Sequence, residues 1–127
     1  MITTDGHPIE CFFTPGSVAD VTTLPDFTMD LAPGSSVYAD KAYTLYSEEE
    51  FLQEAADIHL CPARKTNSLR AVPPYVAYWR ELMRKRIETA ISQIQVLIPK
   101  SIHAVTPRGF ELKAFLFVLA YSVTKAA

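Results

Sequence analysis

The spacing of apolar residues changes along the chain, from short strand-like runs in the first half to long helical stripes in the second. Two opening runs, Ile2–Thr4 and Ile9–Thr14, flank the segment Asp5-Gly6-His7-Pro8. Because Asp-Gly between two β-prone runs is a strong hairpin signal, these runs are predicted to be the arms of a hairpin. The first arm is very short, so we expect further residues of the domain upstream of it.

Four elements are predicted between the hairpin and Pro62, in the order helix, strand, helix, strand. Ser17 can cap the first helix, and Pro25 ends or kinks it. Ser47 followed by three glutamates is typical of the start of the second helix. The predicted ranges are Val18–Leu24 for the first helix, Ser35–Ala39 for the first strand, Ser47–Ala56 for the second helix and Ile58–Cys61 for the second strand.

The second half is predicted to be a loop followed by two helices. Arg64–Pro74 is the polar loop, a long helix begins at Tyr75 and ends before Pro99, and a last apolar helix covers Phe110–Thr124. Strands that alternate with helices after an opening hairpin predict an α/β fold with a sheet of mixed strand directions. Apolar residues recur every three or four positions along the long helix, at Trp79, Met83, Ile87, Ile91, Ile94 and Ile98.

The composition favours a single domain with its own apolar core. The chain has 127 residues, of which 49% are apolar. Cys11 and Cys61 form no disulfide framework and are interpreted as buried thiols of a cytoplasmic protein. The most apolar run, Ala114–Tyr121, is far shorter than the ~20 residues that span a bilayer, and it predicts a buried core helix. No signal peptide opens the chain, and no membrane partner is expected.

Charge is distributed unevenly along the chain. The net charge is −2, yet residues 1–63 carry −10 and residues 64–127 carry +8. One interpretation is that each half is an ordinary solvated surface. The other is that the basic half binds a polyanion while carboxylates of the acidic half bind a cation.

Two carboxylates are candidate metal ligands. Asp40 follows the first predicted strand, and α/β folds place their chemistry at the carboxyl ends of strands. Glu88 lies at the border of the stripe centred on Ile87 on the long helix, where a carboxylate can point into a cleft. Position alone favours a helix cap or a turn aspartate for Asp40, and helical geometry alone favours a pair between Glu88 and Arg84 one turn away.

Carboxylates from separate elements beside a group of arginines suit metal-assisted phosphoryl chemistry. Mg²⁺ prefers oxygen ligands, and two such ions can activate the attacking oxygen and neutralise the leaving oxygen of a phosphodiester. The sequence has no glycine-rich phosphate loop, no CxxC and no HExxH. His7, His59 and His103 are widely separated and are interpreted as structural residues.

Several segments, in order, resemble one protein family. Thr14–Val21, Val37–Tyr43 and Arg84–Ile94 resemble three motifs of the Asp-Asp-Glu (DDE) transposases of bacterial insertion sequences, and Pro99–Thr106 and Gly109–Lys113 continue the likeness. The resemblance covers nearly the whole chain. It implies an RNase H-like fold, a mixed sheet with flanking helices and cut-and-paste DNA transposition. It also implies Mg²⁺ or Mn²⁺ held by two aspartates and a glutamate.

The resemblance assigns roles to individual residues. Asp40 matches the second catalytic carboxylate and Glu88 the third, and both are expected to be metal ligands. Arg84 matches an arginine that contacts the DNA backbone near the active site. The residues expected to bind the phosphates of transposon-end and target DNA are Arg64, Lys65, Arg80, Arg84, Lys85 and Arg86.

The resemblance fails at the start of the chain. The family places its first catalytic aspartate on a strand before the opening hairpin, and neither Asp5 nor Asp20 matches that position. Residues 1–127 are therefore predicted to be a partial, N-terminally truncated DDE catalytic domain without the DNA-recognition region, inactive by itself. The alternatives are a non-catalytic fragment that binds DNA, or pairs with itself or with full-length transposase to modulate it, and a remnant of a degenerate element.

Overall fold

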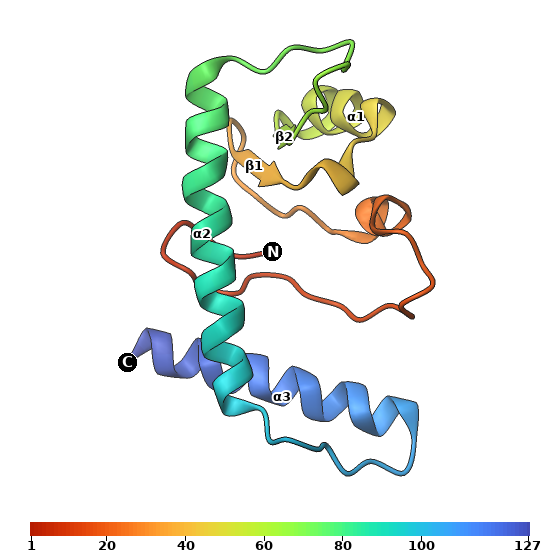
Figure 1. Cartoon of the computed structure of the whole chain (residues 1–127), viewed down its shortest axis with the longest axis vertical. Coiled ribbons are helices and arrows are strands. Elements are labelled where there is room, and N and C mark those ends of the chain that lie inside the picture. Colours follow the sequence, from red (N-terminus) through yellow and green to blue (C-terminus); the bar gives the residue numbers. More distant parts are fainter. The chain divides into compact units, whose positions relative to one another are not determined.

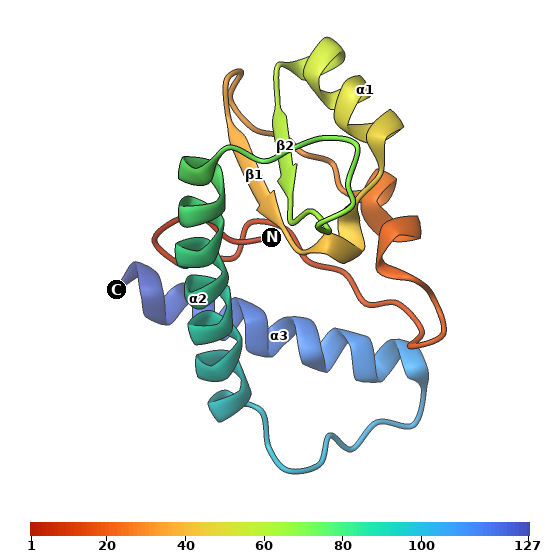
Figure 2. The ribbon, with the colours of Figure 1, turned by 45° about the horizontal axis from the view of Figure 1, so that its top comes forward.

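The computed structural model describes all 127 residues and divides the chain into two compact units. One unit, here called the sheet unit, is formed by residues 14–84 (Figures 1 and 2). The other, the helical unit, is formed by residues 1–13 and 85–127. The chain is mixed α/β, as predicted. Its elements are the 3-10 helix η1 (Asp20–Asp26), β1 (Ser36–Ala39), the 3-10 helix η2 (Lys41–Tyr43), α1 (Tyr46–Ala56), β2 (His59–Pro62), α2 (Pro74–Leu97) and α3 (Pro107–Ala126).

The sheet has two parallel strands, β1 and β2, joined by η2 and α1 (Figure 2). The register pairs Ser36 with His59 and Ala39 with Pro62. Ile58 is fully buried beside β2, and Leu52 of α1 and Leu60 of β2 are also buried. A parallel pair needs such a crossover and covered faces, and the short apolar runs of both strands fit that need. Both strands and the end of α1 at Ala56 are confirmed.

Local details of the sheet unit differ from the predictions. The predicted helix at Val18–Leu24 is the 3-10 helix η1, which contains Pro25 and is preceded by Ala19, so Ser17 does not cap it. Its first turn is held by hydroxyls, because Thr22 Oγ1 donates to the Ala19 carbonyl at 2.6 Å and Thr23 Oγ1 donates to the Asp20 carbonyl at 2.7 Å. These local bonds compete with α-helical geometry and favour the tighter helix.

The first residue of α1 also differs from the prediction. Leu45 precedes the helix, and its carbonyl accepts the amide hydrogens of Glu48 and Glu49, so Ser47 lies inside the first turn. At the other end, Asp57 adopts a left-handed conformation with φ of 53°, and Gln53 Nε2 donates to its carboxylate at 3.0 Å. That conformation ends the helix and directs the chain into β2.

The predicted hairpin forms its turn but not its arms. Gly6 adopts a φ of 88°, which favours glycine, and the Thr3 amide donates to the His7 carbonyl at 2.8 Å. Ile2 and Pro8 form one isolated antiparallel bridge, and residues 9–14 form no strand. Pro8 has no amide hydrogen with which to extend a ladder. The expected mixture of strand directions is thus absent from the sheet itself.

The helical unit is built around Tyr121 of α3. The Tyr121 hydroxyl is buried and lies 3.2 Å from the Gly6 carbonyl oxygen and 3.0 Å from Gln93 Oε1, to which it can donate. The rings of Phe13 and Phe115 meet edge to face, with centroids 4.9 Å apart. These contacts connect the N-terminal segment with both helices of the unit.

The buried face of α2 is shifted from the centre of the predicted stripe, and Met83, Ile94 and Ile98 of that stripe are half-buried. Ile87 is 37% exposed and Ile91 is 48% exposed, whereas Ala90 is buried. Ala90 and Gln93 are three residues apart and share a face, and Gln93 is the residue that meets Tyr121. The predicted stripe is therefore buried mainly along the edge that is nearest to Ala90.

Helix α3 begins earlier than predicted and is less buried. Thr106 Oγ1 accepts the Gly109 amide hydrogen at 3.0 Å, and Pro107 is the first helical residue, a combination that favours a helix start. Only Ala114 and Tyr121 of α3 are buried, so the prediction of a buried core helix is wrong. No helix of the structure combines the length and the apolar content needed to cross a membrane.

Candidate functional site

Asp40 lies directly after β1, where the chain turns into η2. Its Oδ1 accepts the Lys41 amide hydrogen at 2.6 Å, so the carboxylate caps η2. Its Oδ2 accepts no hydrogen bond in the structure, and the residue is exposed. The structure is thus compatible with Asp40 as a capping residue and as a metal ligand, because the same side chain caps a short helix and presents one carboxylate oxygen to solvent.

The carboxylates of Asp20 and Asp40 both act on Tyr43 of η2. Burial raises the pKa of the Tyr43 hydroxyl, and the negative charges of Asp20 and Asp40 raise that pKa further. Helices η1 and η2 are in contact, which brings the two acidic residues to the same side of the sheet unit. The sequence motif that contains Asp20 therefore lies beside the one that contains Asp40.

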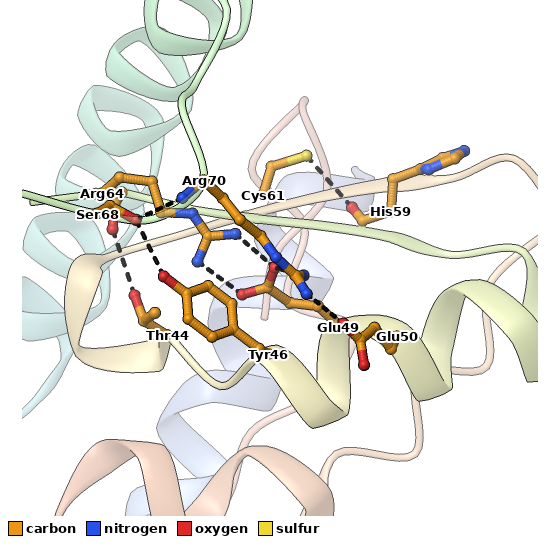
Figure 3. Close-up of polar contacts among 10 residues, drawn as sticks. Thr44, Tyr46, Glu49, Glu50, His59, Cys61, Arg64, Ser68 and Arg70 are labelled. Carbon is orange, nitrogen blue, oxygen red and sulfur yellow. Dashed lines mark hydrogen bonds and ion pairs between the residues drawn. The ribbon is translucent and has the colours of Figure 1, made fainter.

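A buried ion pair lies at the same edge of the sheet (Figure 3). Arg64, which follows β2, donates two hydrogen bonds to the Glu49 carboxylate of α1, at 2.8 and 2.5 Å. The side chain of Glu49 is 8% exposed and that of Arg64 is 11% exposed. This bidentate arrangement raises the pKa of Arg64, chiefly through the hydrogen bond to Glu49.

Further side chains extend this pair into a network, here called the arginine cluster (Figure 3). Arg70 forms ion pairs with Glu49, at 3.4 Å, and with Glu50. The guanidinium carbons of Arg64 and Arg70 lie 5.1 and 4.4 Å from the centre of the Tyr46 ring, within cation–π range. The cluster comprises Tyr46, Glu49, Glu50, Arg64 and Arg70, and the Tyr46 hydroxyl lies 3.1 Å from Ser68 Oγ.

An open pocket of about 390 Å³ borders the arginine cluster, of which Tyr46 and Arg64 line its wall. Lys41 of η2 and Lys65 line it and have no ion pair in the structure. No aspartate or glutamate lines this pocket. The remaining lining residues are Thr44, Tyr46, Arg64, Asn67, Ser68 and Leu69.

The other predicted residues lie on α2. Glu88, Lys85 and Arg86 are exposed and belong to the helical unit, whereas Arg84 is exposed and Arg80 is half-buried in the sheet unit. Asp40 and Glu88 thus belong to different units of the chain. The structure contains no group of three or more histidine, cysteine, aspartate or glutamate side chains that could hold a metal ion.

The sequence did not reveal two features of this edge. Arg64 was expected to bind phosphate, yet its guanidinium is held by Glu49, a residue 15 positions earlier on another element. Lys41, which follows Asp40 and lines the pocket, is not among the residues that the sequence predicted to bind phosphate. The alignment of two strand ends was the available signal, because residues that follow parallel strands meet at one edge of a sheet.

The cysteines and histidines contribute no further site. Cys11 is exposed and Cys61 is half-buried, so the prediction of two buried thiols is wrong for Cys11. Desolvation by the surrounding atoms raises the pKa of both thiols. His59 Nε2 lies 3.8 Å from Asp57, and His103 Nε2 lies 3.4 Å from Ser101 Oγ.

Comparison with known proteins gives no relative. No protein-family model matches the chain, and neither a curated protein nor a solved structure matches it.

Proposed function

We propose that this chain is part of the RNase H-like catalytic domain of an insertion-sequence DDE transposase, and that it acts on DNA in the bacterial cytoplasm. The observation that carries the proposal is the position of Asp40. It follows a strand of a parallel pair, is exposed, and has one carboxylate oxygen without a hydrogen bond. The carboxyl edge of a parallel sheet is where α/β proteins position reactive side chains.

In this proposal Glu88 is the second carboxylate that the chain contributes. It is exposed on α2, one turn after Arg84 and two residues after Arg86. A helix that presents a carboxylate beside several basic side chains offers ligands for a cation and for a phosphodiester at the same time.

Asp40 and Glu88 fit Mg²⁺ or Mn²⁺ by donor chemistry, because both offer carboxylate oxygens. The cation, when bound, supplies charge stabilisation for the attacking and leaving oxygens of the phosphodiester. Arg84 would hold the DNA backbone beside Glu88. The sequence supplies two of the three carboxylates that the family uses, so we expect little or no strand cleavage by this chain alone.

Paramagnetic Mn²⁺ tests whether the two carboxylates share a cation. In the ¹⁵N-labelled chain, Mn²⁺ is expected to broaden the amide signals around both Asp40 and Glu88. Either Asp40→Asn or Glu88→Gln alone is expected to weaken binding at least tenfold. Glu54→Gln is the matched control, because Glu54 is exposed on α1 and makes no ion pair. Broadening near one carboxylate only, or equal effects of all three variants, would contradict a shared site.

A nicking assay tests whether this chain cleaves DNA by itself. The chain is incubated with supercoiled plasmid and Mg²⁺ or Mn²⁺, and we expect no cleavage above that of the Asp40→Ala variant. Robust nicking that Asp40→Ala abolishes would show that the chain has a complete catalytic centre.

A second candidate function is DNA binding without catalysis. The observation that favours it is the run Arg84-Lys85-Arg86, three successive exposed basic residues on α2. DNA affinity is then expected to fall steeply as salt rises, and to fall again when Lys85 and Arg86 are replaced by glutamine. Affinity that is unchanged between low and high salt would remove this candidate.

A further inference from the structure

The two strand ends of the sheet unit bring basic residues to one pocket. The register ends with Ala39 opposite Pro62, and the Ala63 amide donates to the Ala39 carbonyl at 2.9 Å. Lys41 and Arg64 each lie two residues beyond that last pair, and Lys65 follows Arg64. Parallel pairing therefore places these residues around the same opening, the pocket of about 390 Å³.

The charges around this pocket are not balanced. The positive charge of Arg64 is offset by the buried Glu49 carboxylate behind the pocket wall. Lys41 and Lys65 have no such partner, and no acidic residue lines the pocket. Two positive charges beside a concave surface attract an anion, and an ammonium group is a compact point charge that suits phosphate.

Neutral donors complete the lining. Ser68 Oγ is held near the Tyr46 hydroxyl at 3.1 Å and accepts the Arg70 amide hydrogen at 3.3 Å, so its position is fixed by the arginine cluster. The Asn67 amide makes no hydrogen bond in the structure and lies in the turn between Lys65 and Ser68. Thr44 Oγ1 donates only a long bond of 3.5 Å, to the Ala63 carbonyl.

We propose that the pocket between Lys41 and Lys65 binds a phosphate group, and that this group is a backbone phosphate of DNA. The source of the phosphate rests on the proposed function, whereas the phosphate site itself rests on the pocket. The paired Arg64 is a positioning residue: its guanidinium is fixed by Glu49 and forms the rigid wall against which the phosphate packs. DNA bound in this way lies next to Asp40, which directly precedes Lys41.

The test compares two charge-matched double variants of the full chain. Lys41→Gln with Lys65→Gln removes the two pocket lysines, and Lys100→Gln with Lys125→Gln removes two exposed lysines of the helical unit. All four side chains are exposed, so both variants should fold, which circular dichroism checks. Binding of a short DNA duplex is measured at several salt concentrations.

We expect the pocket variant to bind DNA roughly tenfold more weakly than the control variant. We also expect the slope of log affinity against log salt to fall by about two, one unit for each lysine that no longer neutralises a phosphate. Equal DNA affinity of the two variants would overturn the inference and leave the proposed function standing.

Inorganic phosphate separates the pocket from the proposed function. In the ¹⁵N-labelled chain, phosphate is expected to shift the signals of Asn67 and Ser68, and the pocket variant is expected to lose these shifts. If phosphate causes these shifts but the chain binds no DNA, the pocket is a phosphate site. The claim that the phosphate belongs to DNA is then overturned, together with the proposed function. No shift of these signals would overturn the phosphate site itself.

Discussion

The sheet unit and the helical unit are stabilised by different kinds of contact. In the sheet unit, apolar residues such as Leu52 and Ile58 share the interior with the buried Glu49–Arg64 ion pair. In the helical unit, the central contact is a tyrosine hydroxyl, and much of the apolar surface of α3 stays exposed. A stripe on α3 shows this plainly, with exposed fractions of 53–62% at Leu112, Leu116, Leu119 and Val123.

The difference shows how side-chain contacts can hold the elements around a short two-stranded sheet in place. A pair of four-residue strands buries little surface, and side-chain contacts must fix the elements around it. The bidentate Glu49–Arg64 pair connects α1 to the segment after β2. Its two parallel hydrogen bonds form only when these two elements are held in one relative position. In the helical unit, Tyr121 connects three segments, but α3 depends less on close packing along its length.

Loss of the buried ion pair is expected to have the largest effect. Glu49→Gln leaves the Arg64 guanidinium nearly buried without a negative partner, and this should lower the free energy of unfolding by about 3–5 kcal/mol. The matched control is Glu50→Gln, because Glu50 pairs with Arg70 at a side chain that is 60% exposed, and its loss should cost at most about 1 kcal/mol. Urea denaturation measures both. Equal losses of unfolding free energy for the two variants would show that the buried ion pair stabilises the fold no more than the exposed one.

Core truncation compares the two units directly. Ile58 is fully buried, so Ile58→Ala should lower the free energy of unfolding by about 2–5 kcal/mol. Leu119 is 58% exposed, and Leu119→Ala should change it by less than about 0.5 kcal/mol. Both substitutions remove a branched aliphatic side chain, so a difference between their losses of unfolding free energy reflects the difference in burial. A large loss for Leu119→Ala in denaturant titrations would mean that the stripe on α3 is covered in solution.

The sequence predicted the elements best where local signals were sufficient. The apolar run before Asp40 placed β1 to within a residue, and the glutamates at the start of α1 placed that helix to within a residue. Asp5-Gly6 also formed its turn, with Gly6 at φ of 88°. Its arms do not pair beyond the bridge between Ile2 and Pro8, because Pro8 has no amide hydrogen with which to extend a ladder.

The missed features depend on residues far apart in the sequence. On α2, the predicted stripe is centred on Ile87, whereas the buried residue is Ala90, and Tyr121, 28 positions after Gln93, contacts the helix one turn from Ala90. Arg64 was grouped with phosphate-binding residues because a free arginine and a paired arginine have the same sequence signature. The sequence places its partner Glu49 at the start of a helix, where acidic residues are common, and only the strand register brings the two together.

The tyrosine contact of the helical unit should have an intermediate effect. Tyr121→Phe removes the hydroxyl that meets the Gly6 carbonyl and Gln93 while keeping the ring in place. The loss should lower the free energy of unfolding by about 1–2 kcal/mol, because the buried Gly6 carbonyl loses its donor. Tyr78→Phe is the control, since the Tyr78 side chain is exposed. Its unfolding curve should overlay that of the unchanged chain, and a Tyr121→Phe curve that also overlays it would refute the role of the hydroxyl.

The smallest expected effect is a change in the reactivity of Cys61 beside the arginine cluster. Burial raises the pKa of the Cys61 thiol and the Glu49 charge raises it further, which outweighs the lowering by Arg64. A raised pKa means less thiolate at a given pH, so alkylation by iodoacetamide should reach half its maximal rate at a higher pH in the folded chain than in urea. The Cys11→Ser variant leaves Cys61 as the single thiol. Limited access alone would lower the maximal rate without moving the midpoint, and a midpoint at or below that in urea would show that Arg64, rather than burial and Glu49, controls this thiol.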